Sequence, residues 1–357
     1  MKKQIFCAAL VLFTVCGNIF AGSLQPSAAP APTMKTLDQV EPRIAIPGGS
    51  FSTSFTISAP GSYYLTGNRT LTSDVNGISI DCNNVTIDLM GYTLAGTGSG
   101  TADGIKTNIR INNIEVRNGT ITTFGGCGIS SYLLCDDIRI INVRCVSNKS
   151  RGVFLYGDNS RIDNCIFSKN GKEGFRTYGS AVVTNCMARD NNDVGIYVDT
   201  GSVVSSCSSV NNNGNGILVH GPSTVSNNTS YNNRGNGIYC SNASCSIIGN
   251  TVNTNDANGI IANGIIKDNC VTGNRGNYGI YAYNGATVVN NKCSSNSNYG
   301  IYACEGSSVI GNSVYYNSGC GIHTGNQCLV DLNSAVENET NIELGLYCVV
   351  PGGNNAP

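Results

Sequence analysis

A repeat of about 21 residues constrains the fold of this chain more than any other feature. A glycine followed by an aliphatic residue recurs at steps of 21, 21, 22, 20, 21 and 21 residues. The glycines are Gly195, Gly216, Gly237, Gly259, Gly279, Gly300 and Gly321. Each period holds short runs of valine, isoleucine and tyrosine between Asn/Gly turns, a pattern typical of β-strands. A fixed period of this length indicates a solenoid, in which each unit buries its apolar face against its neighbours.

Two columns of polar residues, nearly all asparagine, keep the same step. The first consists of Asn142, Asn164, Asn185, Ser206, Asn228, Asn250, Asn269, Asn291, Asn312 and Asn333. The second consists of Asn148, Asn170, Asn191, Asn212, Asn233, Asn255, Asn274, Asn296 and Asn317. Asparagine tolerates left-handed backbone and bonds to neighbouring groups, so it suits the corners between short strands. Coils stack roughly 4.8 Å apart, so we expect each side-chain amide to bond to the next and the columns to be structural.

Alternation along each strand predicts which side chains face the core. The residue after each glycine is apolar, and successive side chains of a strand point to opposite sides. The predicted core column is Ile105, Ile129, Val153, Phe175, Ile196, Ile217, Ile238, Ile260, Ile280, Ile301 and Ile322. Two residues further, a second inward column is Val198, Val219, Cys240, Ala262, Ala282 and Ala303.

With this Asn-Gly-Ile repeat, and with the sequence NNVTIDLMGYTLAG at 83–96, the chain resembles the secreted parallel β-helix proteins of the pectin-lyase-like superfamily. The resemblance covers about Asn76 to Ser334. It implies an all-β fold, a right-handed parallel β-helix (solenoid), for which we expect about twelve coils. It does not imply one activity, because the same repeat serves lyases, hydrolases, epimerases and non-catalytic adhesins.

The segments outside the repeat predict export and a domain order. Residues 1–21 combine Lys2 and Lys3 with an apolar run and Ala21, which predicts a signal peptide and a secreted product, extracellular or periplasmic. A Pro/Ala-rich linker follows at 22–33. We expect an N-terminal cap at 34–75, the β-helix domain at 76–345 and a free tail at 346–357. No later run reaches the roughly 18 apolar residues of a membrane span.

The low charge of the chain limits the classes of molecule that it is expected to bind. The net charge is −1 with 12% charged residues, so we expect neither nucleic acid nor an anionic membrane as a partner.

Fifteen of the 17 cysteines lie outside the signal, an odd number, so at least one lacks an intramolecular partner. The pairs Cys240–Cys245 and Cys320–Cys328 are positioned to close local loops on the outer surface. A column of Cys165, Cys186 and Cys207, continued by Thr229, Thr251 and Cys270, has a spacing that permits bridging but does not require it.

The outward positions of the strand after each glycine predict a ligand-binding strip. Its tyrosines are Tyr156, Tyr197, Tyr239, Tyr281 and Tyr302, which we name as candidate substrate-binding residues. An exposed aromatic strip can stack on sugar rings. The alternative explanation is that tyrosine has a high β-propensity and is placed there for that reason.

Four polar residues interrupt the aromatic strip on three adjacent coils, and these are Arg176, Tyr178, Asp199 and His220. Elimination from a uronate polysaccharide needs a cation beside the carboxylate, a base for the C5 proton and an acid for the leaving oxygen. Arg176 can be the cation, His220 or Tyr178 the base and acid, and Asp199 can orient His220. The alternative is an ordinary surface ion pair between Asp199 and His220, worth about 0–1 kcal/mol.

Departures from known enzyme patterns keep two functions open. The three clustered aspartates and the Gly-His-Gly of polygalacturonases are missing, and Val219-His220-Gly221 matches only in part. The acidic cluster of calcium-dependent pectate lyases is not evident, so we expect no cofactor, and with two histidines in the chain no zinc site. The main hypothesis is an uronate-polysaccharide lyase or epimerase, or a related glycoside hydrolase, acting on an acidic extracellular polysaccharide. The alternatives are a non-catalytic adhesin that binds glycan or protein, and a structural spacer.

Overall fold

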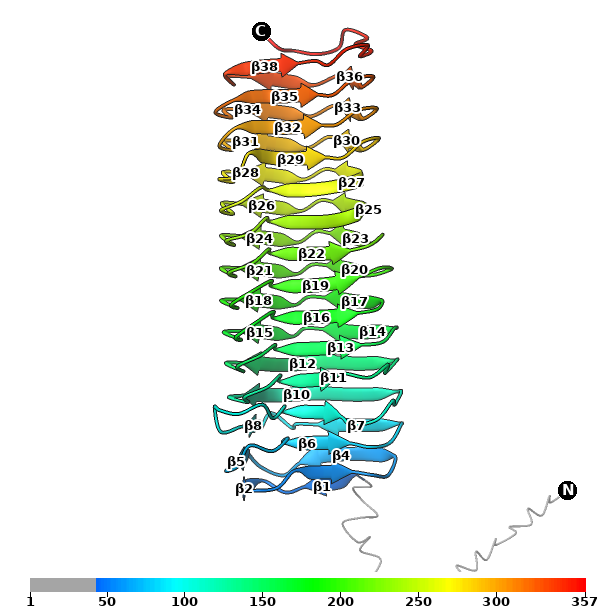
Figure 1. Cartoon of the computed structure of the whole chain (residues 1–357), viewed down its shortest axis with the longest axis vertical. Coiled ribbons are helices and arrows are strands. Elements are labelled where there is room, and N and C mark those ends of the chain that lie inside the picture. Colours follow the sequence, from blue (N-terminus) through cyan, green and yellow to red (C-terminus); the bar gives the residue numbers. More distant parts are fainter. Residues whose placement is uncertain (1–42) are drawn as a thin grey trace, which may run out of the picture. The chain divides into compact units, whose positions relative to one another are not determined.

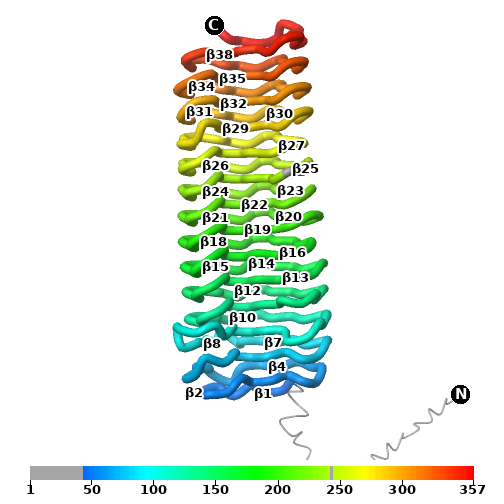
Figure 2. The backbone as a smooth tube through the Cα atoms, in the orientation of Figure 1, coloured from blue at the N-terminus to red at the C-terminus, as the bar shows by residue number. Residues whose placement is uncertain are grey.

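The computed structural model describes residues 43–357, which form one parallel β-solenoid of about 14 turns (Figure 1). The predicted all-β fold is confirmed, with two more turns than the expected twelve or so. The predicted signal peptide, the linker and residues 34–42 of the predicted cap lie outside the described residues. Figure 2 shows the coils as layers that follow one another along a single axis.

Each coil contributes strands to three faces of the solenoid. The first face consists of β3 (Phe55–Ile57), β6 (Ile78–Ile80), β9 (Ile105–Thr107), β11 (Ile129–Ser131), β13 (Val153–Tyr156), β16 (Phe175–Tyr178), β19 (Ile196–Asp199), β22 (Ile217–His220), β25 (Ile238–Ile248), β27 (Ile260–Lys267), β29 (Tyr278–Ala282), β32 (Tyr299–Ala303), β35 (Cys320–Thr324) and β38 (Thr340–Glu343).

The second face consists of β1 (Ile44–Ile46), β4 (Gly61–Leu65), β7 (Val85–Asp88), β10 (Ile114–Thr122), β12 (Ile138–Val146), β14 (Ser160–Asp163), β17 (Ala181–Thr184), β20 (Val203–Ser205), β23 (Thr224–Ser226), β30 (Thr287–Val289), β33 (Ser308–Ile310) and β36 (Leu329–Asp331). The long strands β25 and β27 continue from the first face into the second.

The third face consists of β2 (Gly49–Phe51), β5 (Arg69–Leu71), β8 (Thr93–Ala95), β15 (Ile166–Ser168), β18 (Met187–Arg189), β21 (Ser208–Val210), β24 (Thr229–Tyr231), β26 (Thr251–Asn253), β28 (Cys270–Thr272), β31 (Lys292–Ser294), β34 (Ser313–Tyr315) and β37 (Ser334–Val336). The strands β10 and β12 continue from the second face into the third.

Parallel pairing in constant register produces the predicted core. Ile196 pairs with Ile217, and Ile217 pairs with Ile238 on the next coil. The residues after the coil glycines are buried as predicted, and Ile217 is fully buried. The second inward column, from Val198 to Ala303, is also buried. Removing one such aliphatic side chain from water contributes about 1.5–3 kcal/mol.

The second asparagine column is a buried hydrogen-bonded ladder, as predicted. Asn191 shows the geometry. Its Oδ1 accepts one hydrogen bond from the backbone N–H of Asn170 at 3.1 Å and a second from the side-chain Nδ2 of Asn170 at 2.9 Å. Its own Nδ2 donates to Asn212 Oδ1 at 2.9 Å and to the Phe167 carbonyl at 3.0 Å. Each amide therefore joins neighbouring coils while satisfying polar groups that water does not reach.

The first asparagine column was wrongly aligned by one residue. Asn185 and Ser206 adopt left-handed backbone at an outer corner, which continues at Asn227. Asn228 is buried one position further along the coil. Cys207 occupies the equivalent buried position in the preceding coil, and its backbone N–H donates to Asn228 Oδ1 at 2.8 Å. Asparagine suits both positions, so the residue type alone could not separate them.

The predicted continuation of the cysteine column was therefore wrong as well. Thr229 pairs with Ser208 on the third face, one position beyond Cys207, and Thr251 pairs with Thr229. Cys270 continues that outer position by pairing with Thr251. The buried column changes instead from cysteine to asparagine between Cys207 and Asn228.

Both ends of the solenoid differ from the predicted boundaries. Strands β1 to β5 of the segment predicted as a cap already pair in parallel with β4 to β8, so the ladder begins at Ile44. At the other end, Val349 and Asn355 of the predicted free tail form parallel bridges to Leu329 and Ser334. Both end segments follow the coil geometry because the adjacent coil offers unpaired backbone groups. Residues 43–357 contain no helix long and apolar enough to cross a membrane.

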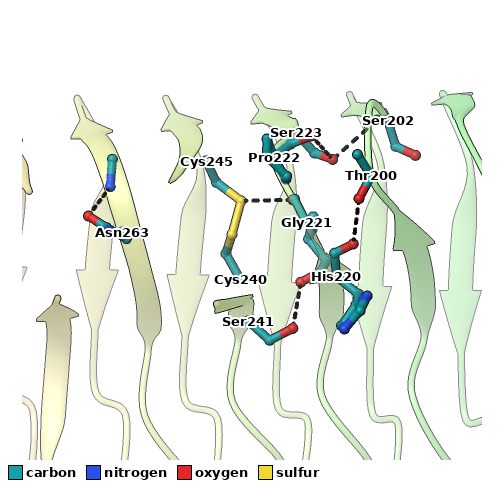
Figure 3. The surroundings of a disulfide bond; sticks show 12 residues. Thr200, Ser202, His220, Gly221, Pro222, Ser223, Cys240, Ser241, Cys245 and Asn263 are labelled. Carbon is teal, nitrogen blue, oxygen red and sulfur yellow. Dashed lines mark hydrogen bonds between the residues drawn. A yellow bond between two sulfur atoms is a disulfide. The ribbon is translucent and has the colours of Figure 1, made fainter. Parts of the chain in front are cut away.

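One of the two predicted disulfides is present. Cys240 and Cys245 are bonded, with a Cα–Cα distance of 6.6 Å, and they lie next to the turn that holds Gly221 and Pro222 (Figure 3). Both are buried, so the bond is part of the core and not of an outer loop as predicted. Cys320 and Cys328 are not bonded to each other, which corrects the second prediction. Their thiols instead contact the carbonyls of Ile322 and Cys304.

Candidate functional site

The candidate site lies on the outward side of the first face, where two residues of each coil project together. One lies directly before the coil glycine and the other lies two residues after it. Glu173 and Arg176 form such a pair, and Tyr278 with Tyr281 form another. Sequence reasoning considered only the positions after the glycine, so it missed the first member of each pair.

Arg176 on β16 is held by a carboxylate and two aromatic rings. Its Nη1 lies 2.6 Å from Glu173 Oε1. Its guanidinium lies 4.5 Å from the ring centroids of Tyr178 and of Tyr197. Nη2 also donates to the Tyr178 hydroxyl. Burial opposes the charge of Arg176, but the hydrogen bond and the charge of Glu173 outweigh burial and raise its pKa. The arginine is thus a fixed cation.

Glu173, which the site prediction missed, connects two coils. It is only 3% exposed, and its Oε2 lies 2.8 Å from Arg151 Nε. Burial alone would raise the pKa of Glu173, but a backbone hydrogen bond, Arg176 and Arg151 outweigh burial and hold the pKa below its ordinary value. Arg151 also lies over the ring of Phe154, 4.9 Å from its centroid. Two arginines therefore share one buried carboxylate, which leaves one net positive charge.

Asp199 and His220 form the second pair of the predicted constellation. The two residues are register partners on β19 and β22, and His220 Nδ1 lies 3.2 Å from Asp199 Oδ1. The backbone N–H of Thr200 also donates to Asp199 Oδ1, at 2.8 Å. The His220 side chain is 60% exposed, so solvent or a ligand can reach it. With Nδ1 facing the carboxylate, Nε2 is the ring nitrogen left for acid or base chemistry.

The four predicted residues lie on three adjacent coils as two pairs. Arg176 pairs in register with Tyr197, and Tyr178 and Asp199 each lie two residues further along these strands. The rings of Tyr178 and Tyr197 meet edge to face at 6.4 Å between centroids. Tyr197 therefore contacts the cation of one pair and lies on the same strand as the carboxylate of the other. Burial raises the pKa of Tyr197.

A further polar group extends the site toward the N-terminal coils. Asp103 is 2% exposed, and its Oδ2 accepts from Ser130 Oγ at 2.7 Å while its Oδ1 accepts from the Cys127 backbone at 2.6 Å. Burial raises the pKa of Asp103. Lys106 Nζ lies 5.5 Å from the ring centroid of Tyr132. The position before the coil glycine could have revealed this group, since it reads Asp103, Cys127, Arg151 and Glu173 in successive coils.

The predicted substrate-binding tyrosines fall into two groups. Tyr156 is exposed and meets Tyr178 edge to face, 6.1 Å between centroids, next to Tyr197 and Arg176. Tyr281 and Tyr302 stack on each other at 5.4 Å with an interplanar angle of 8°, and Tyr302 stacks on His323 at 4.6 Å. Neighbouring coils therefore turn the faces of Tyr281 and Tyr302 toward each other. The remaining predicted residue, Tyr239, lies between Leu218 and Ile261 and belongs to neither group.

Beside the first group, the surface is hollowed at the turn that follows β13 and β16. The hollow has a volume of about 370 Å³. It is lined by Asn159, Ser160, Arg161, Ser180, Ala181, Val182 and Gly201. None of the four predicted catalytic residues lines it. Among residues 43–357, no group of three or more His, Cys, Asp or Glu side chains is arranged to hold a metal ion.

Comparisons with known proteins agree with this geometry at the level of the fold. The sequence matches the family model described as right handed beta helix region over residues 56–202, 128–264 and 204–340. No curated protein matches the sequence. Similar solved structures include the mannuronan C-5 epimerase AlgE4 A-module of Azotobacter vinelandii, at 13% identity over 88% of this chain and 91% of that chain, with a TM-score of 0.49.

Two further solved structures are also similar to this chain. The periplasmic alginate epimerase AlgG is 12% identical over 84% of this chain and 77% of that chain, with a TM-score of 0.49. The Dettilon tailspike protein is 13% identical over 88% of this chain and 60% of that chain, with a TM-score of 0.42. At these identities the likeness concerns the fold alone.

Proposed function

Because this chain belongs to the family of proteins with a right handed beta helix region, we propose that it binds an acidic extracellular polysaccharide along its first face. The observation that carries the proposal is the alternation of cations and aromatic rings across adjacent coils. Lys106 lies over Tyr132, Arg151 over Phe154, and Arg176 between two tyrosines. The exposed rings of Tyr132 and Tyr178 would contact the apolar side of a sugar, while the arginines would face its carboxylate; Phe154 is buried and supports Arg151 from below.

The charge balance around Arg176 favours an acidic sugar over a neutral one. Arg151 and Arg176 share the single carboxylate of Glu173, so this group of three side chains keeps one net positive charge. Arginine is fixed here by pairing and ring contacts, so little side-chain entropy is lost when a ligand carboxylate approaches. Export of the chain, expected from residues 1–21, would place this face where such polysaccharides occur.

The finer proposal is that the bound uronate undergoes proton abstraction, as in a lyase or an epimerase. The support is the Asp199–His220 pair on the coils directly after Arg176 and Tyr178. Arg176 would stabilise the charge that develops on the uronate carboxylate when the C5 proton leaves. His220 Nε2 would accept that proton, with Asp199 holding the ring, and the Tyr178 hydroxyl would protonate the departing oxygen. Return of a proton from the opposite side would give an epimerase instead.

One panel tests both levels of the proposal. Binding of alginate, pectate, a glycosaminoglycan and a neutral glucan is measured by calorimetry, for the natural chain, Arg176→Gln and the control Arg275→Gln. Arg275 is an exposed arginine on a distant coil, paired with Asp256. We expect at least one acidic polymer to bind, Arg176→Gln to weaken that binding about tenfold, and Arg275→Gln to leave it unchanged. Equal affinity for the neutral glucan would contradict the proposed substrate class.

The same panel is assayed for chemistry by ultraviolet absorbance of unsaturated uronate and by solvent deuterium incorporation at C5. We expect His220→Ala to abolish either product while the polymer still binds, because His220 is assigned to proton transfer and not to charge pairing. Binding without any product in the natural chain would favour the non-catalytic adhesin. The absence of both binding and product across the panel would overturn the proposed function.

A further inference from the structure

Three cysteine side chains stack in one buried column at the corner between the second and third faces. Cys165, Cys186 and Cys207 occupy equivalent positions in the successive coils that carry β13, β16 and β19. The backbone N–H of Cys165 lies 3.5 Å from Cys186 Sγ, and that of Cys186 lies 3.5 Å from Cys207 Sγ. The three thiols are free in this structure and at most 3% exposed. The sulfurs of Cys186 and Cys207 thus take the acceptor position that an asparagine amide holds in later coils.

The coil spacing allows a bond between neighbours in this column but not between its ends. Stacked coils are roughly 4.8 Å apart, which falls within the Cα separations of about 4.4–6.8 Å found in disulfides. Cys165 and Cys207 are two coils apart, or about 10 Å, and cannot be joined without backbone movement. Hydrogen bonding to the neighbouring thiol, together with burial, raises the pKa of Cys186 and of Cys207.

We propose that this column is a disulfide site with two mutually exclusive bonds, Cys165–Cys186 and Cys186–Cys207. Cys186 is common to both bonds and has one sulfur, so each molecule forms only one of them. The inference does not depend on the proposed ligand. The proposal concerns a covalent link between the coils that carry β13, β16 and β19. Either bond joins two coils that also carry parts of the candidate site.

The bond forms by exchange with a disulfide oxidant, such as glutathione disulfide or an oxidised protein dithiol. The thiolate of one cysteine attacks the oxidant, which yields a mixed disulfide and releases one thiol. The thiolate of the second cysteine then attacks the protein sulfur of the mixed disulfide, closes the S–S bond and releases the second thiol. The two cysteines together lose two electrons and two protons, and the oxidant is reduced to two thiols. Because the folded column is buried and its thiols are protonated, this exchange takes place while the coils are forming.

Tryptic mapping can separate the three cysteines, because each lies in a different peptide. Cys165 lies in 162–169, Cys186 in 177–189 and Cys207 in 190–234, and none of these peptides contains another cysteine. The full chain is unfolded and reduced, refolded with reduced and oxidised glutathione, alkylated at its free thiols, digested without reduction and analysed by mass spectrometry. Far-UV circular dichroism confirms refolding of every variant.

The expected result is two linked species, 162–169 with 177–189 and 177–189 with 190–234, each with the third cysteine alkylated. Cys165→Ser should leave only the second link, Cys207→Ser only the first, and Cys186→Ser neither. The control Cys293→Ser removes a buried thiol from another part of the core and should leave both links. Alkylation of all three cysteines in the refolded natural chain would overturn the proposal. So would a link between 162–169 and 190–234, or a persistent link in Cys186→Ser. Loss of folding in one variant leaves the result in the natural chain decisive.

Discussion

At the scale of single residues, Glu173 organises the candidate site. A buried carboxylate is costly unless it is paired, and here two arginines from successive coils pair with it. Removing it would leave Arg151 and Arg176 close together without their shared anion. The orientation of Arg176 toward a ligand therefore depends on a residue that would not contact the ligand itself.

The lowered pKa of Glu173 predicts a pH dependence of stability. Because the folded pKa lies below the ordinary value of about 4.3, Glu173 stabilises the fold fully above that pH and loses its contribution as pH falls through the folded pKa. We expect Glu173→Gln to melt several degrees lower than the natural chain at pH 7, and the difference to shrink below about pH 4. Thermal unfolding followed by circular dichroism between pH 3 and 7 measures this. Glu305→Gln, at an exposed position, is the control, and a gap that stays constant with pH would contradict the prediction.

Residue patterns predicted which residues of the constellation share a face, but not their partners. Arg176, Tyr178, Asp199 and His220 could be placed on neighbouring coils because alternation and a constant step fix the facing of each side chain. Glu173 was missed because only the positions after the glycine were considered, although the position before the glycine also recurs in successive coils. The misaligned asparagine column has a similar cause, since asparagine fits both a left-handed corner and the buried position after it.

At the scale of elements, the buried asparagine ladders join the coils at their corners. Asn250 is 1% exposed. Its Oδ1 accepts from the backbone N–H of Asn228 at 2.9 Å and from the side-chain Nδ2 of Asn228 at 3.0 Å. Its own Nδ2 donates to the Val225 carbonyl at 2.9 Å. The ladder therefore satisfies backbone groups on several coils at once, which the strands themselves cannot reach.

Loss of one ladder residue should be costly. We expect Asn250→Ala to lower the free energy of unfolding by about 1–3 kcal/mol, because it leaves buried polar groups without partners. The control is Asn213→Ala, an exposed turn residue whose amide contacts only Asn192 among the hydrogen bonds of its side chain that the structure describes. Asn213→Ala should change stability by less than about 0.5 kcal/mol. Urea unfolding measures the free energy of unfolding of both variants. Equal losses of stability in the two variants would contradict the proposed contribution of the buried ladder.

The strands of the regular coils could be predicted because each period repeats the same pattern, and repetition averages out local ambiguity. The ends of the solenoid could not. Residues 44–71 and 349–355 join the parallel ladder without the glycine-aliphatic repeat, because the edge of the adjacent coil, and not their own sequence pattern, determines their conformation.

At the scale of the whole molecule, the solenoid has a nearest-neighbour architecture. Each inner coil packs on the one before and the one after it, and equivalent residues of the regular coils stay in register, as in Ile280 with Ile301. A bulge between β25 and β27 shifts the register locally. Stability in such a chain is approximately a sum of coil and interface contributions. Removal of one complete coil should therefore leave a folded, shorter molecule.

Deletion of residues 280–300 tests this expectation. The deletion joins Gly279 to Ile301, so Asn274 would meet Asn317 in the buried ladder. It removes Tyr281 but leaves the coils that carry Arg176, Tyr178, Asp199 and His220 intact. We expect circular dichroism typical of β-structure and a maximum dimension, from small-angle X-ray scattering, that is shorter by roughly 5 Å. The matched control removes residues 280–289, about half a coil, and should fail to fold cooperatively because every later side chain changes its facing. Similar behaviour of the two deletions would contradict a nearest-neighbour architecture.

The constant register also has a consequence for the gene that encodes such a chain. An in-frame duplication or loss of the codons for one regular coil brings equivalent positions of two coils together. The protein can therefore become longer or shorter by single coils while the pattern of buried residues stays the same. The coils that carry Asp103, Arg151 and Glu173 are different, because each presents its own side chain before the glycine. Recombination there would change the chemistry of the surface, whereas recombination among the later coils would mainly change the reach of the protein.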